Sequence, residues 1–310
     1  MIEPRRHLLL DSRSGTFIGR KPSGRTMIDI RALQPFGAEL FADLSCDLDS
    51  QDQARLCDLL SRHKLLVCRD HQLTREDQNR IMGYLGPVLP AEREHRELAL
   101  DGDFGSAPIA YHSDLLFTPS PYPRISLFAL DVDEGLSSTR FVSGISACAA
   151  LPVQLRNRLE GLHAISIVPQ VQTHRAIDPD ASSVMRSHRH PVLSAHPVTG
   201  ETILMPTEMQ TARIEGLSLA DSEALLHELF GYLYQPDRVH EHVWHRGDLV
   251  IWDNHALQHG RDDQSARRVR RLRRVVGAEL SFYDLCPEFV KDDPQIKDWG
   301  NGQKWTAANS

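Results

Sequence analysis

A histidine and an aspartate stand two residues apart in an apolar stretch, and this pair constrains the fold more than any other feature of the sequence. His112 and Asp114 lie in the segment 109–117, where most of the other residues are apolar. This composition predicts a strand, on which residues i and i+2 point to the same face. The imidazole and the carboxylate would then converge, as two of the three protein ligands do in a 2-His-1-carboxylate iron site. The alternative is a hydrogen-bonded His–Asp pair on a half-buried strand, and the pair taken alone favours that alternative.

Charge and composition argue against several classes of protein. The chain has 310 residues and a formal net charge of −7, whereas nucleic-acid-binding proteins usually carry a basic surface. No apolar run approaches the roughly 20 residues that span a bilayer, and the apolar run near the N-terminus is too short for an export signal. The five cysteines are scattered without a C-x-x-C pair, which is typical of reduced thiols. We therefore expect a cytoplasmic protein that binds neither nucleic acid nor membranes.

Helix and strand patterns alternate along the chain. Thr74 is a predicted N-cap, with Asp77 at the third position of the helix that follows. A polar loop covers 88–107 and leads into His112, and loops of this length are often functional flaps. Periodicity and turn signals predict helices at 51–64, 74–85, 146–160 and 218–233, strands at 65–69, 124–130, 137–144 and 247–254, and a hairpin arm with a Thr-Gly turn at 196–205.

Histidines also occur away from the first pair. His188 and His190 could form a second metal pair on a strand, but no third ligand follows at a familiar spacing, so we favour a structural role for them. His255 and His259 follow the apolar strand at 247–254. On proximity alone, either of these two could supply a third ligand to the site of His112.

Seven arginines lie between residues 261 and 274. As a basic patch they would indicate a contact with phosphates. The valines and the leucine among them instead favour a strand of a folded core, on which Arg270 and Arg274 share one face. Arginines aimed inward need anions because an unpaired buried charge is costly. The pattern therefore favours an enzyme that binds a dicarboxylate.

Together these segments resemble the TauD/TfdA family of Fe(II)- and 2-oxoglutarate-dependent dioxygenases. The resemblance covers most of the chain from about residue 27 to 280, and its order and spacing are more specific than any single element. It is carried by Tyr-His112-Ser-Asp114 with Phe117, Thr139 placed 27 residues after His112, His196-Pro-Val-Thr-Gly, Gly247-Asp-Leu-Val-Ile-Trp-Asp-Asn-His-Ala-Leu-Gln-His259 and Arg270-Arg-Leu-Arg-Arg274.

The resemblance implies a role for each of six residues. His112, Asp114 and His259 match the iron ligands, because the family's ligand follows W-D-N-x-x-x-Q and this selects His259 over His255. Thr139 and Arg270 match the residues that hold the far carboxylate of 2-oxoglutarate, for which a planar guanidinium is well suited. Arg274 matches an arginine that meets an anionic group of the substrate in several members.

The fold implied is mainly β with flanking helices (α+β), built on a double-stranded β-helix, that is, a jelly-roll or cupin-like core. One domain would cover 27–283 with a partly helical insertion at about 143–245, between an N-terminal extension (1–26) and a C-terminal tail (284–310). Relatives are often dimers or tetramers, so we expect a homodimer or homotetramer.

The activity implied is oxidation of a small-molecule substrate by hydroxylation, desaturation or cyclisation. Fe(II), 2-oxoglutarate and O2 would be required, and succinate and CO2 released. Pro108 stands where taurine oxygenases carry an asparagine, so taurine is not the expected substrate; an anionic intermediate of secondary metabolism is preferred. Two alternatives stay open, a zinc-dependent hydrolase on a cupin-like barrel and a non-catalytic ligand-binding barrel.

Overall fold

The computed structural model describes residues 28–90, 97–99, 106–168, 186–264 and 269–287. The predicted extension at 1–26, most of the predicted tail at 284–310 and parts of the polar loop at 88–107 lie outside these residues. The described chain is mainly β with flanking helices, as the sequence predicts.

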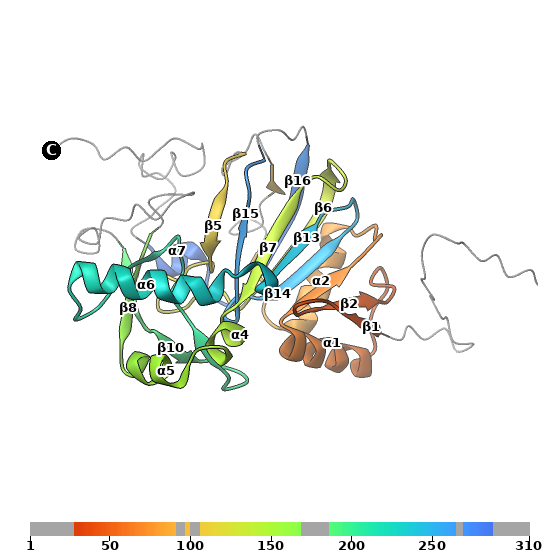
Figure 1. The fold of residues 1–310 in the computed structure, drawn as a ribbon. Coiled ribbons are helices and arrows are strands. Elements are labelled where there is room, and N and C mark those ends of the chain that lie inside the picture. Colours follow the sequence, from red (N-terminus) through yellow and green to blue (C-terminus); the bar gives the residue numbers. More distant parts are fainter. Residues whose placement is uncertain (1–27, 91–96, 100–105, 169–185, 265–268, 288–310) are drawn as a thin grey trace, which may run out of the picture.

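Two β-sheets face each other and enclose the main core (Figure 1). The larger sheet has the strand order β1-β2-β3-β14-β6-β16-β4, and the smaller has the order β13-β7-β15-β5. The larger sheet consists of β1 (Asp29–Ala32), β2 (Ala38–Phe41), β3 (Leu65–Cys68), β4 (Glu97–Leu98), β6 (Arg124–Val132), β14 (Leu249–Asp253) and β16 (Arg270–Gly277). The smaller sheet consists of β5 (Ile109–His112), β7 (Ser138–Ser143), β13 (Val239–Val243) and β15 (Leu257–Arg261).

The middle of the larger sheet is buried on both faces, which explains the continuous apolar run on β14. Val250 and Trp252 point into the core between the sheets, where Trp252 meets Phe141 of β7 edge-on at a ring distance of 5.4 Å. Leu249 and Ile251 point the other way, under α1 (Ser50–His63) and α2 (Arg75–Leu85). A strand buried on both faces needs apolar residues at successive positions.

Most helices begin and end close to the predicted residues. The capping box predicted from Thr74 and Asp77 is present at the start of α2, and Ser218 caps α6 (Leu219–Leu233). The single helix predicted at 146–160 is wrong. It is divided into α4 (Gly144–Ala149) and α5 (Val153–Leu159), because Pro152 between them disfavours helical backbone in the residue before it.

A lobe between β7 and β13 has its own apolar core around α4, α5 and α6, and lies beside the two sheets in Figure 1. The hairpin predicted at 196–205 is present as the β10–β11 pair, with Gly200 at a φ of 72° in its turn. The remaining elements are β8 (His163–Ile167), β9 (Ser187–Pro191), β10 (Leu193–Ala195), β11 (Thr202–Leu204), β12 (Thr211–Ile214), the 3-10 turn Pro236–Arg238 and α7 (Phe282–Leu285).

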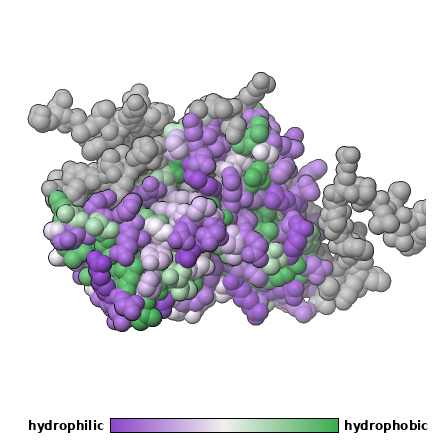
Figure 2. Space-filling model, in the orientation of Figure 1, coloured by the Kyte–Doolittle hydropathy of each residue, from purple (hydrophilic) through white to green (hydrophobic). Residues whose placement is uncertain are grey.

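The surface mixes polar and apolar residues. Figure 2 shows hydrophilic and hydrophobic residues interspersed over the face in view. The large apolar side chains that are exposed stand on separate elements, such as Leu136 before β7 and Val198 in the β10–β11 turn. Of the helices that the structure describes, none has the length and apolar character needed to cross a membrane.

Candidate metal and co-substrate site

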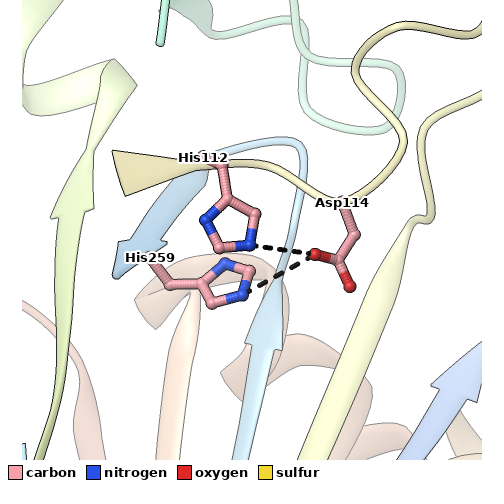
Figure 3. A group of neighbouring side chains, drawn as sticks. All are labelled: His112, Asp114 and His259. Atoms are coloured by element: carbon pink, nitrogen blue, oxygen red, sulfur yellow. Dashed lines mark ion pairs between the residues drawn. The ribbon is translucent and has the colours of Figure 1, made fainter. Parts of the chain in front are cut away.

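Three side chains from two distant parts of the chain meet at the end of the smaller sheet (Figure 3). His112 ends β5, His259 stands opposite it on β15, and Asp114 follows in the next turn. The Nε2 atoms of His112 and His259 lie 3.4 and 3.7 Å from Oδ1 of Asp114. One ligand atom from each residue lies within 4.8 Å of the other two, and no other such group occurs among the described residues.

The predicted convergence of His112 and Asp114 is present, but its predicted cause is wrong. The strand ends at His112, and Asp114 lies in a turn, where the next residue, Leu115, has a φ of 61°. A non-glycine residue in the left-handed region is strained. The turn, rather than the alternation of a strand, therefore directs the carboxylate toward the imidazoles.

Hydrogen bonding and burial prepare the three groups to bind a cation. The Nδ1 atom of His112 lies 3.0 Å from the carbonyl oxygen of Ala110, which can only accept, so Nδ1 carries the proton and Nε2 keeps its lone pair. Burial and the neighbouring His112 lower the pKa of His259 to about 3. Burial alone would raise the pKa of Asp114, but Arg274 and the two imidazoles outweigh it and hold this pKa well below its ordinary value. A carboxylate beside two imidazoles is a donor set that suits Fe(II).

Gly260 allows the two ligand-bearing strands to approach closely. A Cβ atom at this position would lie 2.8 Å from the carbonyl oxygen of Ile109 on β5. Any other residue would therefore push β15 away from β5, and with it His259 away from His112.

Arg270 and Thr139 meet in the core between the sheets. A terminal guanidinium nitrogen of Arg270 donates to Oγ1 of Thr139 at 3.3 Å, and the indole nitrogen of Trp244 donates to the same oxygen at 3.0 Å. Arg270 is 4% exposed, and its Nε atom is buried without a partner in the described part of the chain. Burial, and then the charge of Arg261, lower the pKa of Arg270 to about 9. A desolvated cation with an unused donor fits a carboxylate.

Arg274 lies on the same strand as Arg270 and contacts one of the candidate metal ligands, Asp114, directly. Its guanidinium pairs with Oδ2 of Asp114, the oxygen that does not face the imidazoles, and its Cζ atom lies 5.6 Å from the centre of the Tyr122 ring. The two oxygens of Asp114 thus face different partners. An anion that pairs with Arg274 in place of Asp114 would therefore lie next to the Asp114 carboxylate.

Comparison with known proteins identifies the family. The profile of "Taurine catabolism dioxygenase TauD, TfdA family" matches residues 29–276, most of the chain. The chain belongs to the TauD/TfdA family. It is a 2-oxoglutarate-dependent non-haem iron dioxygenase, which uses Fe(II), 2-oxoglutarate and O2. The zinc hydrolase and the non-catalytic barrel are therefore set aside.

Two named relatives of this TauD/TfdA member are 30% and 26% identical to it over the aligned residues. It is 30% identical over 261 residues to the alpha-ketoglutarate-dependent sulfate ester dioxygenase of Pseudomonas putida, covering 77% of this chain and 85% of that protein. It is 26% identical over 271 residues to pentalenolactone F synthase of Streptomyces arenae, covering 76% and 91%. A solved structure of AAD-2 in complex with Mn(II) and N-oxalylglycine superposes with a TM-score of 0.68 at 25% identity, covering 82% and 99%.

The other histidines that the sequence singled out as candidate metal ligands, His188, His190 and His255, lie outside the group of three. His255, which proximity alone could not separate from His259, lies beside His196 at a ring distance of 6.1 Å. His188 and His190 lie side by side on β9 with ring centres 4.6 Å apart. Nε2 of His190 donates to the carbonyl oxygen of Leu116 at 2.7 Å, in keeping with the structural role that the sequence favours for this pair.

Sequence reasoning gave no role to the side chains that hold the backbone in and near the site. His196, known from its motif alone, accepts at Nδ1 from the N–H groups of Val198 and Thr199 in the β10–β11 turn, so its Nε2 carries the proton and donates to Asp253 at 2.8 Å. Asn254 and Gln210, both buried, contact the turn of Asp114. Asn254 stands in the Trp-Asp-Asn motif, which was the available signal; Gln210 has no local signal.

Proposed function

We propose that this dioxygenase holds Fe(II) through the imidazoles of His112 and His259 and the carboxylate of Asp114. The observation that supports this most is the convergence of the three ligand atoms within 4.8 Å from two strands and a turn. A site with these three protein ligands leaves three positions for 2-oxoglutarate and O2. The free Nε2 lone pair of His112 and the low pKa of His259 favour the unprotonated nitrogens that a metal requires.

The far carboxylate of 2-oxoglutarate would bind Arg270 and Thr139. The unused Nε donor and the deep burial of Arg270 support this role, because a carboxylate there would restore the interactions that the guanidinium lost on leaving water. Iron, 2-oxoglutarate and O2 would supply the oxidant, and succinate and CO2 would be released. The protein's part is to hold the co-substrate and to orient the C–H bond that is oxidised.

The substrate would be a small or medium-sized organic anion, with Arg274 as its cationic partner. Arg274 lies next to Asp114, so an anion bound there would stand beside the metal. The anionic sulfate ester named for the Pseudomonas relative supports this class, and pentalenolactone F synthase supports an intermediate of secondary metabolism. The outcome at an unactivated C–H bond would be hydroxylation, desaturation or cyclisation.

The same resemblance supports proposals about architecture. We propose that the two facing sheets form a double-stranded β-helix, the jelly-roll or cupin-like core, in a single domain at 27–283. The lobe would be the insertion at about 143–245 between core strands. A homodimer or homotetramer and a cytoplasmic location remain predictions, which gel filtration and cell fractionation would test.

The test is oxygen-dependent succinate formation by protein purified without oxygen and reloaded with Fe(II). We expect slow formation without substrate and faster formation with a suitable anion, whose product has gained one oxygen or lost two hydrogens by mass spectrometry. His112→Ala should lose both activities and the bound iron. Undiminished succinate formation by His112→Ala would overturn the ligand assignment.

A further inference from the structure

The side chain of Asn254 hydrogen-bonds to both the backbone N–H and the backbone carbonyl of Asp114. The amide oxygen of Asn254 accepts from the backbone N–H of Asp114 at 3.0 Å, and its amide nitrogen donates to the carbonyl oxygen of Asp114 at 3.1 Å. The same nitrogen also donates to the carbonyl oxygen of Tyr122 at 2.9 Å. Asn254 has no exposed surface, and it immediately follows β14, so these bonds tie Asp114 to the larger sheet.

Gln210 holds the preceding residue in the same way. Its amide oxygen accepts from the backbone N–H of Ser113 at 3.2 Å, and its amide nitrogen donates to the carbonyl oxygen of Ser113 at 2.9 Å. Gln210 is 1% exposed and comes from the lobe, one residue before β12. The neighbouring backbone N–H of Met209 donates to the carbonyl oxygen of Tyr111 at 3.2 Å. Residues 209–210 thus pair with the end of β5 as a neighbouring strand would.

The two carboxamides therefore supply the backbone hydrogen bonds of Ser113 and Asp114, which a neighbouring strand would supply if β5 continued. A carboxamide has one donor side and one acceptor side, as a peptide group has, so it can satisfy both the N–H and the C=O of one residue. The turn includes a strained residue, Leu115, and strained backbone persists only where its surroundings fix it. Without these contacts, Ser113 and Asp114 would be free to take an unstrained path that moves the carboxylate.

We propose that Asn254 and Gln210 are positioning residues, which fix the turn 112–114 so that the Asp114 carboxylate faces the two imidazoles. The proposal rests on the proposed metal role of His112, Asp114 and His259. Asn254 acts on a ligand residue itself, and Gln210 acts on the residue between two ligands. The effect of losing Asn254 is therefore the larger of the two.

The experiment uses the full-length protein, with Mn²⁺ affinity measured by calorimetry and the visible absorption of bound Co²⁺ as a report on coordination geometry. Asn254→Leu and Gln210→Met remove the hydrogen bonds at similar volume. We expect the Mn²⁺ dissociation constant to rise at least about tenfold in Asn254→Leu, since loss of a group that orients a ligand costs about 10- to 100-fold in metal affinity. In Gln210→Met, where the lost bonds are to Ser113 and not to a ligand residue, we expect a rise of about threefold, below that range. The Co²⁺ spectrum should change in both variants.

Gln78→Met is the matched control. Gln78 is an equally buried carboxamide, but it bonds to Ser126 and Arg273 under α2. This variant should lower the melting temperature and leave the Mn²⁺ affinity and Co²⁺ spectrum unchanged. If Asn254→Leu and Gln210→Met behave like the control, the proposal is wrong.

Two further variants keep the outcomes separate. If Asn254→Leu does not fold, Asn254→Asp preserves the side chain's shape and one acceptor but turns the donor into a second acceptor against two carbonyls, and it should show the same loss of affinity. The second variant is His112→Ala. If it binds Mn²⁺ as tightly as the wild type does, the metal assignment itself is wrong, whatever the carboxamide variants do.

Discussion

Arg270 and Arg273 stand three residues apart on β16, and both are almost completely buried, at 4% and 6% exposure. Arg273 points under α2, where it donates to Oε1 of Gln78 at 2.7 Å and to the carbonyl oxygens of Leu73 and Thr74 at 2.8 Å each. Arg270 points between the sheets, where the described residues offer it one long bond to Thr139 and leave its Nε atom without a partner.

The contrast separates two uses of a buried cation. Arg273 obtains neutral acceptors from the protein, so its guanidinium is a structural connection between α2 and β16. This also corrects the expectation that every inward arginine needs an anion, since an amide and two backbone carbonyls are enough here. Arg270 obtains too few acceptors, and the missing ones correspond to a carboxylate. Four substitutions test this distinction.

Arg270→Met should have the largest effect. It removes the cation but keeps an unbranched apolar side chain, so the 2-oxoglutarate concentration required for half-maximal succinate formation should rise at least about 100-fold, or roughly 3 kcal/mol. The free energy of unfolding should stay within about 1 kcal/mol of wild type. An unchanged 2-oxoglutarate requirement would remove Arg270 from the co-substrate site.

Arg273→Met should show the opposite pattern. It leaves the acceptors of Gln78 and Leu73 buried without this partner and removes one of the two donors to the carbonyl of Thr74, so the free energy of unfolding should fall by about 2–4 kcal/mol. Denaturant titration measures this loss, and the folded fraction should keep a nearly normal 2-oxoglutarate requirement. If this variant has the same free energy of unfolding as the wild type, the guanidinium of Arg273 does not stabilise the packing of α2 against β16.

Thr139→Val should have a smaller effect on co-substrate binding. It removes the hydroxyl that accepts from Arg270 and from Trp244 while keeping the shape of the side chain. The 2-oxoglutarate requirement should rise about five- to tenfold, the equivalent of about 1 kcal/mol. Steady-state kinetics at saturating iron would measure it, and an effect as large as that of Arg270→Met would contradict the supporting role of the threonine.

Arg271→Gln should have the smallest effect. Arg271 pairs with Glu97 at 2.9 Å, but both side chains are exposed, so the pair contributes less than about 0.5 kcal/mol to stability. Neither the denaturation midpoint nor the 2-oxoglutarate requirement should change measurably. A loss comparable with that of Arg273→Met would show that exposure does not distinguish the arginines of this strand.

Local patterns in the sequence predicted much of the fold. Periodicity located α1, α2 and α6, and the capping box at Thr74 marked the start of α2 to the residue. The prediction of one helix at 146–160 overlooked Pro152, although the effect of a proline on the residue before it is a local signal. These features depend on residues within one or two turns of each other, which is why a single sequence contains them.

The site was harder to predict from the sequence than the fold was, because the residues that form it are distant from one another in the chain. His255 and His259 are equivalent by local pattern, and only the resemblance or the pairing of β15 with β5 separates them. Parity along β16 places Arg270 and Arg273 on opposite faces, as the structure has them. It could not show which of the two obtains acceptors from the protein, because the acceptors of Arg273 lie about 200 positions earlier in the chain. Gln210 was missed for the same reason, because its partner Ser113 lies 97 residues earlier in the chain.

The attachment of residues 209–210 to the end of β5 has a consequence for engineering. Exchanging the lobe for that of a relative would also replace the contacts on Tyr111 and Ser113. Under the proposed metal assignment, such a chimera would bind iron less tightly. Libraries that vary the lobe should therefore keep Met209 and Gln210 constant.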